Sequence, residues 1–173
     1  MAGTATETGK VPTVAEQGSA ASGPVTDDTT LSELARWAAG EVEDAISCGI
    51  TVSASSENPR VGASSDELAR RMDAIQYVLE DGPCLSCMRQ REEVRIPDLR
   101  RERRWLEFAV RGQREGVGSS LSVPMIVGDE VVGAVNLYSP VHDGLDDGSL
   151  ERARQVAEQA GKVISEDAAP APS

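Results

Sequence analysis

The chain has 173 residues, of which 39% are hydrophobic, and its 17 Lys and Arg against 29 Asp and Glu give a net charge of −12. A chain of this length forms one domain, with or without tails. Its acidic balance repels phosphate backbones and anionic membrane surfaces, which argues against direct binding of DNA, RNA or a membrane.

The cysteines and the apolar runs indicate the compartment. Three cysteines, Cys48, Cys84 and Cys87, are an odd and sparse set that does not resemble a secreted disulfide framework. No apolar run approaches the roughly 18 residues that a membrane span needs, and the N-terminus lacks the apolar core of a signal peptide. We therefore expect a cytoplasmic protein with no membrane contact.

Both ends of the sequence have the composition of disordered tails. Residues 1–30 are rich in Ala, Gly, Ser, Thr and Glu, and residues 166–173 end in Ala-Pro-Ala-Pro-Ser. Such segments bury too little apolar surface to offset the entropy lost on ordering. We expect one folded domain over residues 31–165.

The first half of this domain begins with a helix. Thr30-Leu31-Ser32-Glu33 fits a capping box, and apolar residues recur at helical spacing over 31–46. Strands are expected at 48–54 and 60–63, on either side of the Asn58-Pro59 turn. Ser64-Ser65-Asp66-Glu67 is a second capping box, and it opens a helix with an apolar stripe of Leu68, Met72, Ile75 and Leu79.

The second half mixes short and long elements. Asp81-Gly82-Pro83 ends the preceding helix, and proline suits the first position of the next helix. The Gly128-Asp129 pair predicts a tight hairpin. Further elements are a strand at 94–96, a helix at 105–114, strands at 119–127 and 130–138, and a helix from about 146 to 164. Locally paired strands between long terminal helices predict an α+β fold.

Several motifs in this region resemble the signature of GAF domains. They are Gln76–Leu85, Val94–Leu99, Arg104-Trp105 with Phe108, Gly116–Ser120 leading into Val123-Pro124-Met125, and Val132–Tyr138. The resemblance covers residues 31–165 and is to the GAF portion of actinobacterial regulators that carry a C-terminal ANTAR RNA-binding module. No ANTAR segment follows in this sequence, so we do not expect this chain to bind RNA directly.

The resemblance implies both a fold and a function. It implies a GAF/PAS-like central antiparallel sheet of about five or six strands, with a pocket on one face and the terminal helices packed together on the other. It implies a sensory domain in signal transduction and transcription regulation, not an enzyme. Such a domain binds an unidentified small molecule or responds to redox state, and it signals through a homodimer of the terminal helices or through a separate output protein. A ligand-free dimerisation module is the alternative of a different kind.

Cys84-Leu-Ser-Cys87 is the sharpest chemical motif. Cys84 is placed near the first turn of a helix, where the helix dipole lowers a thiol pKa, so Cys84 and Cys87 are redox candidates. The alternative is that both are small core residues. Zinc would need two more ligands, and only Cys48 and His142 remain, so no metal is expected and no cofactor is named.

An enzymatic alternative rests on the same cysteine. Some GAF proteins reduce free methionine sulfoxide with several cysteines, and Cys84 falls near one position that they use. No further cysteine follows Val94, where their catalytic thiol would be expected. The only histidine, His142, is either a haem ligand or an exposed loop residue, and an aromatic content of 3% argues against a large tetrapyrrole pocket.

A pocket is expected between one sheet face and residues 75–114. This cover is interrupted by Gly82, Pro83, Pro97 and Gly112, and an irregular cover over a rigid sheet leaves gaps where ligands bind. The expected lining residues are Cys84, Trp105, Phe108, Ser120 and Ser122.

A run of arginines lies within the same segment. It is interleaved with glutamates, so it forms either an anion-binding surface or a salt-bridged surface in solvent. Its members are Arg89, Arg91, Arg95, Arg100, Arg101, Arg103 and Arg104.

Overall fold

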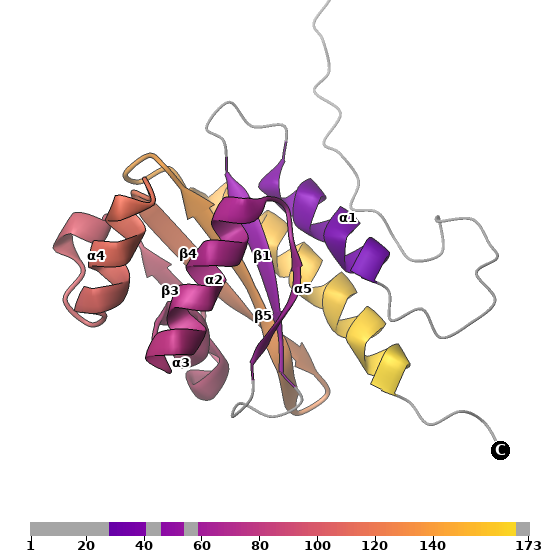
Figure 1. The fold of residues 1–173 in the computed structure, drawn as a ribbon. Coiled ribbons are helices and arrows are strands. Elements are labelled where there is room, and N and C mark those ends of the chain that lie inside the picture. The colour runs from indigo at the N-terminus through magenta and orange to yellow at the C-terminus, as the bar shows by residue number, and fades with distance from the viewer. Residues whose placement is uncertain (1–27, 41–45, 54–58, 169–173) are drawn as a thin grey trace, which may run out of the picture.

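The computed structural model describes residues 28–40, 46–53 and 59–168, and its centre is one antiparallel sheet (Figure 1). The strand order is β2-β1-β5-β4-β3, and each neighbouring pair runs antiparallel. The strands are β1 (Ser47–Val52), β2 (Arg60–Ser64), β3 (Val94–Ile96), β4 (Ser119–Val127) and β5 (Glu130–Ser139). The expected α+β class is confirmed, and so is the antiparallel sheet of about five or six strands that the family resemblance implied, here with five strands.

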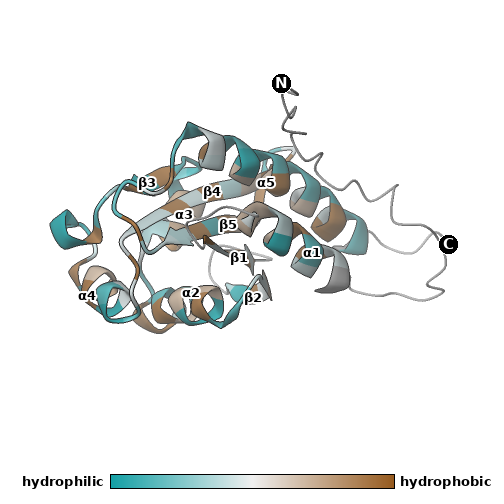
Figure 2. Ribbon diagram, turned by 90° about the horizontal axis from the view of Figure 1, so that it is seen from above, coloured by the Kyte–Doolittle hydropathy of each residue, from teal (hydrophilic) through white to brown (hydrophobic). Residues whose placement is uncertain are grey.

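Helices cover both faces of the sheet. In Figure 2 the sheet lies between α1 and α5 on one side and α2 and α4 on the other. The helices are α1 (Asp28–Ala39), α2 (Glu67–Leu79), α3 (Pro83–Gln90), the 3-10 turn η2 (Leu99–Arg101), α4 (Leu106–Arg114) and α5 (Asp147–Ala168). Among the described helices, none is both long and apolar enough to cross a membrane.

Strand register divides the sheet into an apolar face and a polar face. Directly opposed residues of an antiparallel pair lie on the same face, and successive residues alternate between faces. The face under α1 and α5 presents Cys48, Ile50, Leu121, Val123, Val135 and Leu137. The face under α2 and α3 presents Thr51, Ser120, Ser122, Asn136 and Tyr138. Most buried polar side chains of the sheet thus lie beneath the irregular cover, whereas Ser119 and Ser139 lie on the other face.

The two terminal helices pack against each other and on the apolar face. Leu34, Ala38, Val156 and Ala160 are buried in the same core as the strands beneath them. A dimer was expected on the argument that one sheet face cannot fully bury the apolar stripes of both terminal helices. In the structure, the apolar sheet face buries most of the described apolar residues of α1 and α5. Partly exposed apolar side chains remain at Trp37, Leu150 and Ile164.

Several predicted boundaries are corrected. Helix α1 begins at Asp28, two residues before the predicted cap at Thr30, and α5 extends to Ala168, past the predicted end of the domain at 165. Of the tails predicted over 1–30 and 166–173, residues 1–27 and 169–173 lie outside the described residues. So does the end of the first predicted helix, including Val42 and Ala45.

The second capping box is also corrected. The N-cap of α2 is Asp66, whose Oδ1 accepts from the Ala69 amide at 2.9 Å. Ser65 Oγ instead accepts from the Cys48 amide, and Ser64 is the last residue of β2. The Asp66 carboxylate is a favourable N-cap because it accepts the cap hydrogen bond and its negative charge also interacts favourably with the helix dipole.

Candidate functional site

A cluster of buried polar side chains lies between the sheet and the helices α2 and α3. Helix α2 contributes Asp73 and Gln76, α3 contributes Cys84, and strand β5 contributes Asn136 and Tyr138. Each of these side chains is at most 1% exposed. Because buried polar groups are costly unless they are hydrogen-bonded, their bonds decide what the cluster can do.

Asp73 is the only acid in this cluster and lies at its centre. Its Oδ1 accepts from Tyr138 Oη at 2.6 Å and from Asn136 Nδ2 at 3.1 Å. Its other oxygen lies so close to strand β1 that a Cβ at Gly49 would stand 2.0 Å from it. Only a residue without a side chain at position 49 allows the carboxyl to reach the sheet.

The surroundings of Asp73 favour its neutral form. Burial raises the pKa of Asp73 to about 7, although the hydrogen bonds from Tyr138 and Asn136 lower it. Desolvation disfavours a buried carboxylate, and hydrogen bonds to the charged form offset only part of that cost. Asp73 therefore changes its protonation state near neutral pH.

Cys84 joins the cover to the sheet. Asn136 Nδ2 lies 3.3 Å from the Cys84 sulfur, and the thiol donates to Thr51 Oγ1 at 3.5 Å. Thr51 also shares a short hydrogen bond with the hydroxyl of Tyr77. Strand β1, strand β5, helix α2 and helix α3 thus meet at one hydrogen-bonded point.

Gln76 fixes the start of helix α3. Its Oε1 accepts from the Cys84 amide at 2.8 Å, and its Nε2 donates to Tyr138 Oη at 3.0 Å. The preceding Gly82 has φ +148°, and a Cβ there would stand 2.4 Å from Gln76 Oε1. A glycine is required because this backbone conformation is strained for other residues.

Four buried polar atoms on this side of the molecule have no hydrogen-bond partner within the described residues. They are Asp73 Oδ2, Asn136 Oδ1, Ser120 Oγ and, on the strand beside Gly49, Ser64 Oγ. Native proteins leave few buried polar atoms unpaired, so each one calls for an explanation. Asn136 Oδ1 is an acceptor, and so is Asp73 Oδ2 when the carboxyl is ionised, so the cluster then has hydrogen-bond capacity for a donor.

The predicted pocket residues lie around the same sheet face. Cys84, Ser120 and Ser122 are buried beneath the cover, and Ser120 and Ser122 lie directly opposite Tyr138 and Asn136 on β5. Phe108 packs in an apolar cluster with Tyr138, and this cluster borders the polar one. Trp105 is half-buried and packs against the apolar clusters that contain Phe108 and Cys84, and its indole N–H donates to Asp81.

A helix N-terminus was expected to lower the pKa of the Cys84 thiol, and in the structure that pKa is raised instead. Cys84 does lie in the first turn of α3, but burial and the neighbouring Asp73 raise its pKa to about 12. Burial and Cys84 itself also raise the pKa of Cys87. Desolvation outweighs the helix dipole, and both residues are free thiols.

Sequence reasoning missed the centre of the cluster. Asp73 and Gln76 interrupt the inward face of an amphipathic helix, and Asn136 is an amide inside a buried strand, where asparagine is rare. These three polar residues at apolar positions were the available signal.

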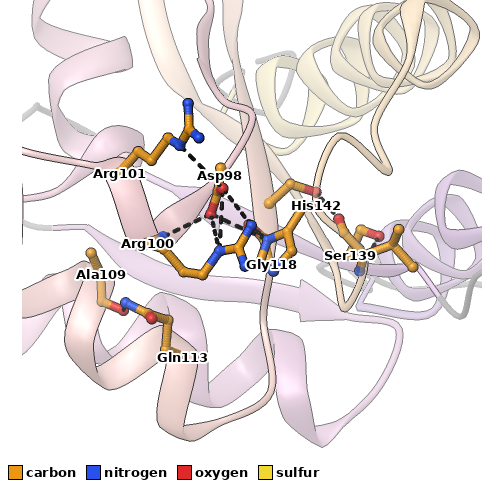
Figure 3. Close-up of polar contacts among 10 residues, drawn as sticks. Asp98, Arg100, Arg101, Ala109, Gln113, Gly118, Ser139 and His142 are labelled. Atoms are coloured by element: carbon orange, nitrogen blue, oxygen red, sulfur yellow. Dashed lines mark hydrogen bonds and ion pairs between the residues drawn. The ribbon is translucent and has the colours of Figure 1, made fainter.

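A second polar arrangement lies on the surface at the end of β5 (Figure 3). The Asp98 carboxylate lies 3.2 Å from His142 Nδ1, forms an ion pair with Arg100 and lies 3.9 Å from Arg101. Hydrogen bonds from the Arg100 guanidinium and amide, together with the nearby His142, lower the pKa of Asp98 to about 2. His142 is thus a partly exposed loop residue with an acidic neighbour.

Three surface hollows are also present. A hollow of about 490 Å³ is lined by His142, Asp98 and Arg100, and one of about 300 Å³ lies beside it at Arg95 and Asp146. The third, of about 690 Å³, runs between β4 and α5 at Ile126 and Arg154. None of the three is lined by the buried cluster, which the cover closes in this structure.

Comparisons with known proteins agree with this architecture. The GAF domain family model matches residues 26–165. No curated protein matches the sequence.

Solved structures with this architecture have little sequence in common with the chain. A type II free methionine-R-sulfoxide reductase from Thermoplasma acidophilum has a TM-score of 0.65 at 14% identity, over 80% of this chain and 92% of that chain. The GAF domain of an Acinetobacter phosphoenolpyruvate-protein phosphotransferase has a TM-score of 0.58 at 15% identity, over 80% and 82%. A GAF domain/HD domain protein from Geobacter sulfurreducens has a TM-score of 0.57 at 18% identity, over 82% and 94%. At such identities the likeness is one of fold.

Proposed function

Because the chain belongs to the GAF domain family, we propose that it is a sensory domain that binds a small molecule beneath its α2–α4 cover and transmits binding to a partner protein. The site is the polar sheet face around Asp73 and Asn136, with Cys84, Trp105, Phe108, Ser120 and Ser122 around it. The observation that carries this proposal is the set of unpaired buried polar atoms on Asp73, Asn136 and Ser120. A purely structural core would replace such atoms by apolar ones, since unpaired burial costs about 1–3 kcal/mol per group.

The output is proposed to be another protein. The sequence motifs resemble the GAF portion of actinobacterial GAF–ANTAR regulators, which supports a role in transcription regulation through a separate output protein. We also propose a homodimer through the outer surfaces of α1 and α5, where Trp37 and Ile164 remain partly exposed. Light scattering checks the dimer: a monomer at about 100 µM would exclude it, because interfaces of standard size hold well below that concentration.

Redox sensing is the alternative input. Oxidation by a peroxide would join the Cys84 and Cys87 sulfurs while the peroxide is reduced to water and alcohol. Both thiols are buried and have raised pKa values, which makes such a reaction slow. Mass spectrometry after peroxide treatment tests it, since a disulfide removes two hydrogens and Cys84→Ser blocks that loss.

The enzymatic alternative is tested by turnover. The structural likeness to a free methionine-R-sulfoxide reductase is one of fold, and the thiols lack the activation that a nucleophile needs. Incubation with free methionine sulfoxide and dithiothreitol should give no methionine above the rate of the Cys84→Ser variant.

Ligand binding is tested on protein purified from its own host. Native mass spectrometry should detect a bound small molecule, and that molecule should raise the melting temperature of stripped protein. Ser120→Ala should weaken binding without unfolding, because Ser120 Oγ has no partner to lose. Ser119→Ala is the control, since Ser119 lies on the other face of β4: it loses the hydrogen bond from its Oγ to the Val141 carbonyl and can lower stability, but it should leave binding unchanged. If no molecule copurifies and no metabolite shifts the melting temperature, a ligand-free dimerisation module replaces this proposal.

A further inference from the structure

The charge around Asp73 indicates what kind of ligand the proposed site accepts. The ionisable groups that face this carboxyl are Tyr77 on α2, Cys84 on α3 and Tyr138 on β5, and Cys48 lies on the other face of β1 but close enough to sense its charge. None of them is basic, so within the described residues Asp73 has no positive partner. Buried acids are normally paired with a cation or a metal, so this acid lacks the group that would stabilise its charge.

The unpaired atoms agree with the charge. When Asp73 is ionised, its Oδ2 and Asn136 Oδ1 are both acceptors. Both residues are completely buried, and neither atom has a donor within the described residues. Asn136 Nδ2 already donates to Asp73, so the two residues present their free oxygens from one bonded pair. A group with two or more N–H donors would satisfy both.

The side of the cluster toward solvent is aromatic. Tyr77 and Trp105 are half-buried, and both pack against the apolar cluster that contains Cys84. Aromatic faces attract organic cations, and Trp105 already holds the Arg104 guanidinium 4.6 Å from its ring centre. A cation entering here would meet an aromatic rim before it reaches the carboxylate.

We propose that the site accepts an organic cation with N–H donors, an amine or a guanidine, and that Asp73 serves as its counter-ion with Asn136 as the second acceptor. This inference rests on the proposed ligand-sensing function and adds the chemical class. The cover seals the cluster in this structure, so the ligand displaces part of α3 or Trp105 when it enters.

Binding of this kind is coupled to a proton. Without a ligand, Asp73 holds its proton below about pH 7. A cationic ligand requires the carboxylate, so the proton must leave when the ligand binds. Affinity should therefore fall by up to about tenfold per pH unit below that value, and it should level off above it.

The experiment uses the full chain and calorimetry at pH 8 and pH 5.5. The probes are agmatine, putrescine and histamine, with 1,4-butanediol as a neutral counterpart and succinate as an anionic one. At least one amine or guanidine should bind, with affinity about tenfold or more weaker at pH 5.5. Titrations in buffers of different ionisation enthalpy at pH 6.5 should show a proton released on binding.

Two variants test whether the cation binds at Asp73. Asp73→Asn keeps the size of the side chain and removes its charge, so it should lose binding by about tenfold or more and lose the pH dependence as well. Asp98→Asn is the matched control. It removes the charge of another acid, in the surface arrangement with Arg100 and His142, and it should leave binding unchanged. A thermal melt confirms that each variant folds, and if Asp73→Asn does not fold, the proton release of the unmodified chain still decides.

The outcomes separate the ligand class from the proposed function. If succinate, the diol or a copurified neutral or anionic molecule binds and Ser120→Ala weakens it, the sensing function stands and the cationic class is wrong. Equal cation binding by Asp73→Asn also overturns the class. If no small molecule binds at all, the sensing function fails, and this inference fails with it.

Discussion

At the scale of single residues, Asp73 is a buried acid whose charged form is costly. It is completely buried, and two hydrogen bonds and no cation stabilise its charged form. An ionised carboxylate in such surroundings is destabilising, so the neutral form is favoured in the folded state. Stability should therefore depend on pH in the direction opposite to that of an ordinary salt-bridged acid.

Asp73→Asn tests this dependence. The folded pKa of Asp73 is raised from 3.8 to about 7, so below about pH 4 both states hold the proton. Between pH 4 and pH 7 the unfolded chain releases its proton first, and the free energy of unfolding falls as the pH rises. The loss is on the order of 4 kcal/mol, and it should be absent from the variant.

Urea denaturation at pH 4.5, 6 and 8 measures the effect. The difference in unfolding free energy between the variant and the unmodified chain should move in favour of the variant with each step up in pH. Other acids titrate equally in both proteins and cancel in that difference. A difference that does not change with pH would mean that Asp73 is ionised throughout.

Position 49 should not tolerate a residue larger than glycine, because the Asp73 carboxyl lies against it. In Gly49→Ala the new Cβ would stand 2.0 Å from Asp73 Oδ2, and the carboxyl has little room to retreat within a closed cluster. We expect a loss of about 1–3 kcal/mol in thermal or urea unfolding. Gly148→Ala is the control, because its Cβ meets only Asp146 Oδ1 at 3.2 Å, in the exposed first turn of α5. Equal stability of the two variants would contradict the close approach.

At the scale of elements, two residues compete as the N-cap of α2, and substitutions can distinguish them. The sequence pattern favours Ser64, whereas the structure gives the cap to Asp66, which also accepts from Ser47 Oγ at 2.6 Å. Asp66→Ala should cost about 1 kcal/mol or more in urea unfolding, the usual value of a lost N-cap. Ser64→Ala should cost almost nothing, since Ser64 Oγ has no partner. The reverse order would restore the cap predicted from the sequence.

The elements themselves were largely predictable. Strands β3 and β4 lie where alternation and turn residues predicted them, and α3 begins at Pro83 as expected for a proline in the first helical position. The errors are at helix ends, such as Asp28 and Ala168. These ends depend on packing against the sheet, which no local pattern contains.

The position of the cover was predictable from the sequence, and the composition of the polar cluster beneath it was not. The irregular segment between Gly82 and Gly112 covers the polar sheet face, and a ligand pocket beneath it stays a prediction. The partners of Cys84, by contrast, come from Thr51 and Asn136, which are 33 and 52 residues away in sequence. Strand register brings them together, and register requires the whole sheet to be in place.

At the scale of the whole molecule, the arginine run is part of a paired surface. Arg89 pairs with Asp81, Arg95 with Asp147, and Arg104 with Glu102. Arg100 and Arg101 share Asp98, as Figure 3 shows. Exposed pairs of this kind contribute little to stability, but they cancel the positive field that a free basic patch would project.

The purified chain should therefore not bind structured RNA at physiological salt. Affinity for RNA comes mainly from cationic side chains that replace counterions on phosphates. Within the described residues, five of the seven arginines of the run are paired with acids, in a chain of net charge −12. An electrophoretic shift assay with a hairpin RNA should show no complex at micromolar protein. If a sub-micromolar complex forms and weakens steeply with salt, the arginines exchange their acidic partners for phosphates. Arg100→Glu with Arg101→Glu would then abolish that complex, whereas Arg70→Glu, at an exposed pair on α2, would leave it intact.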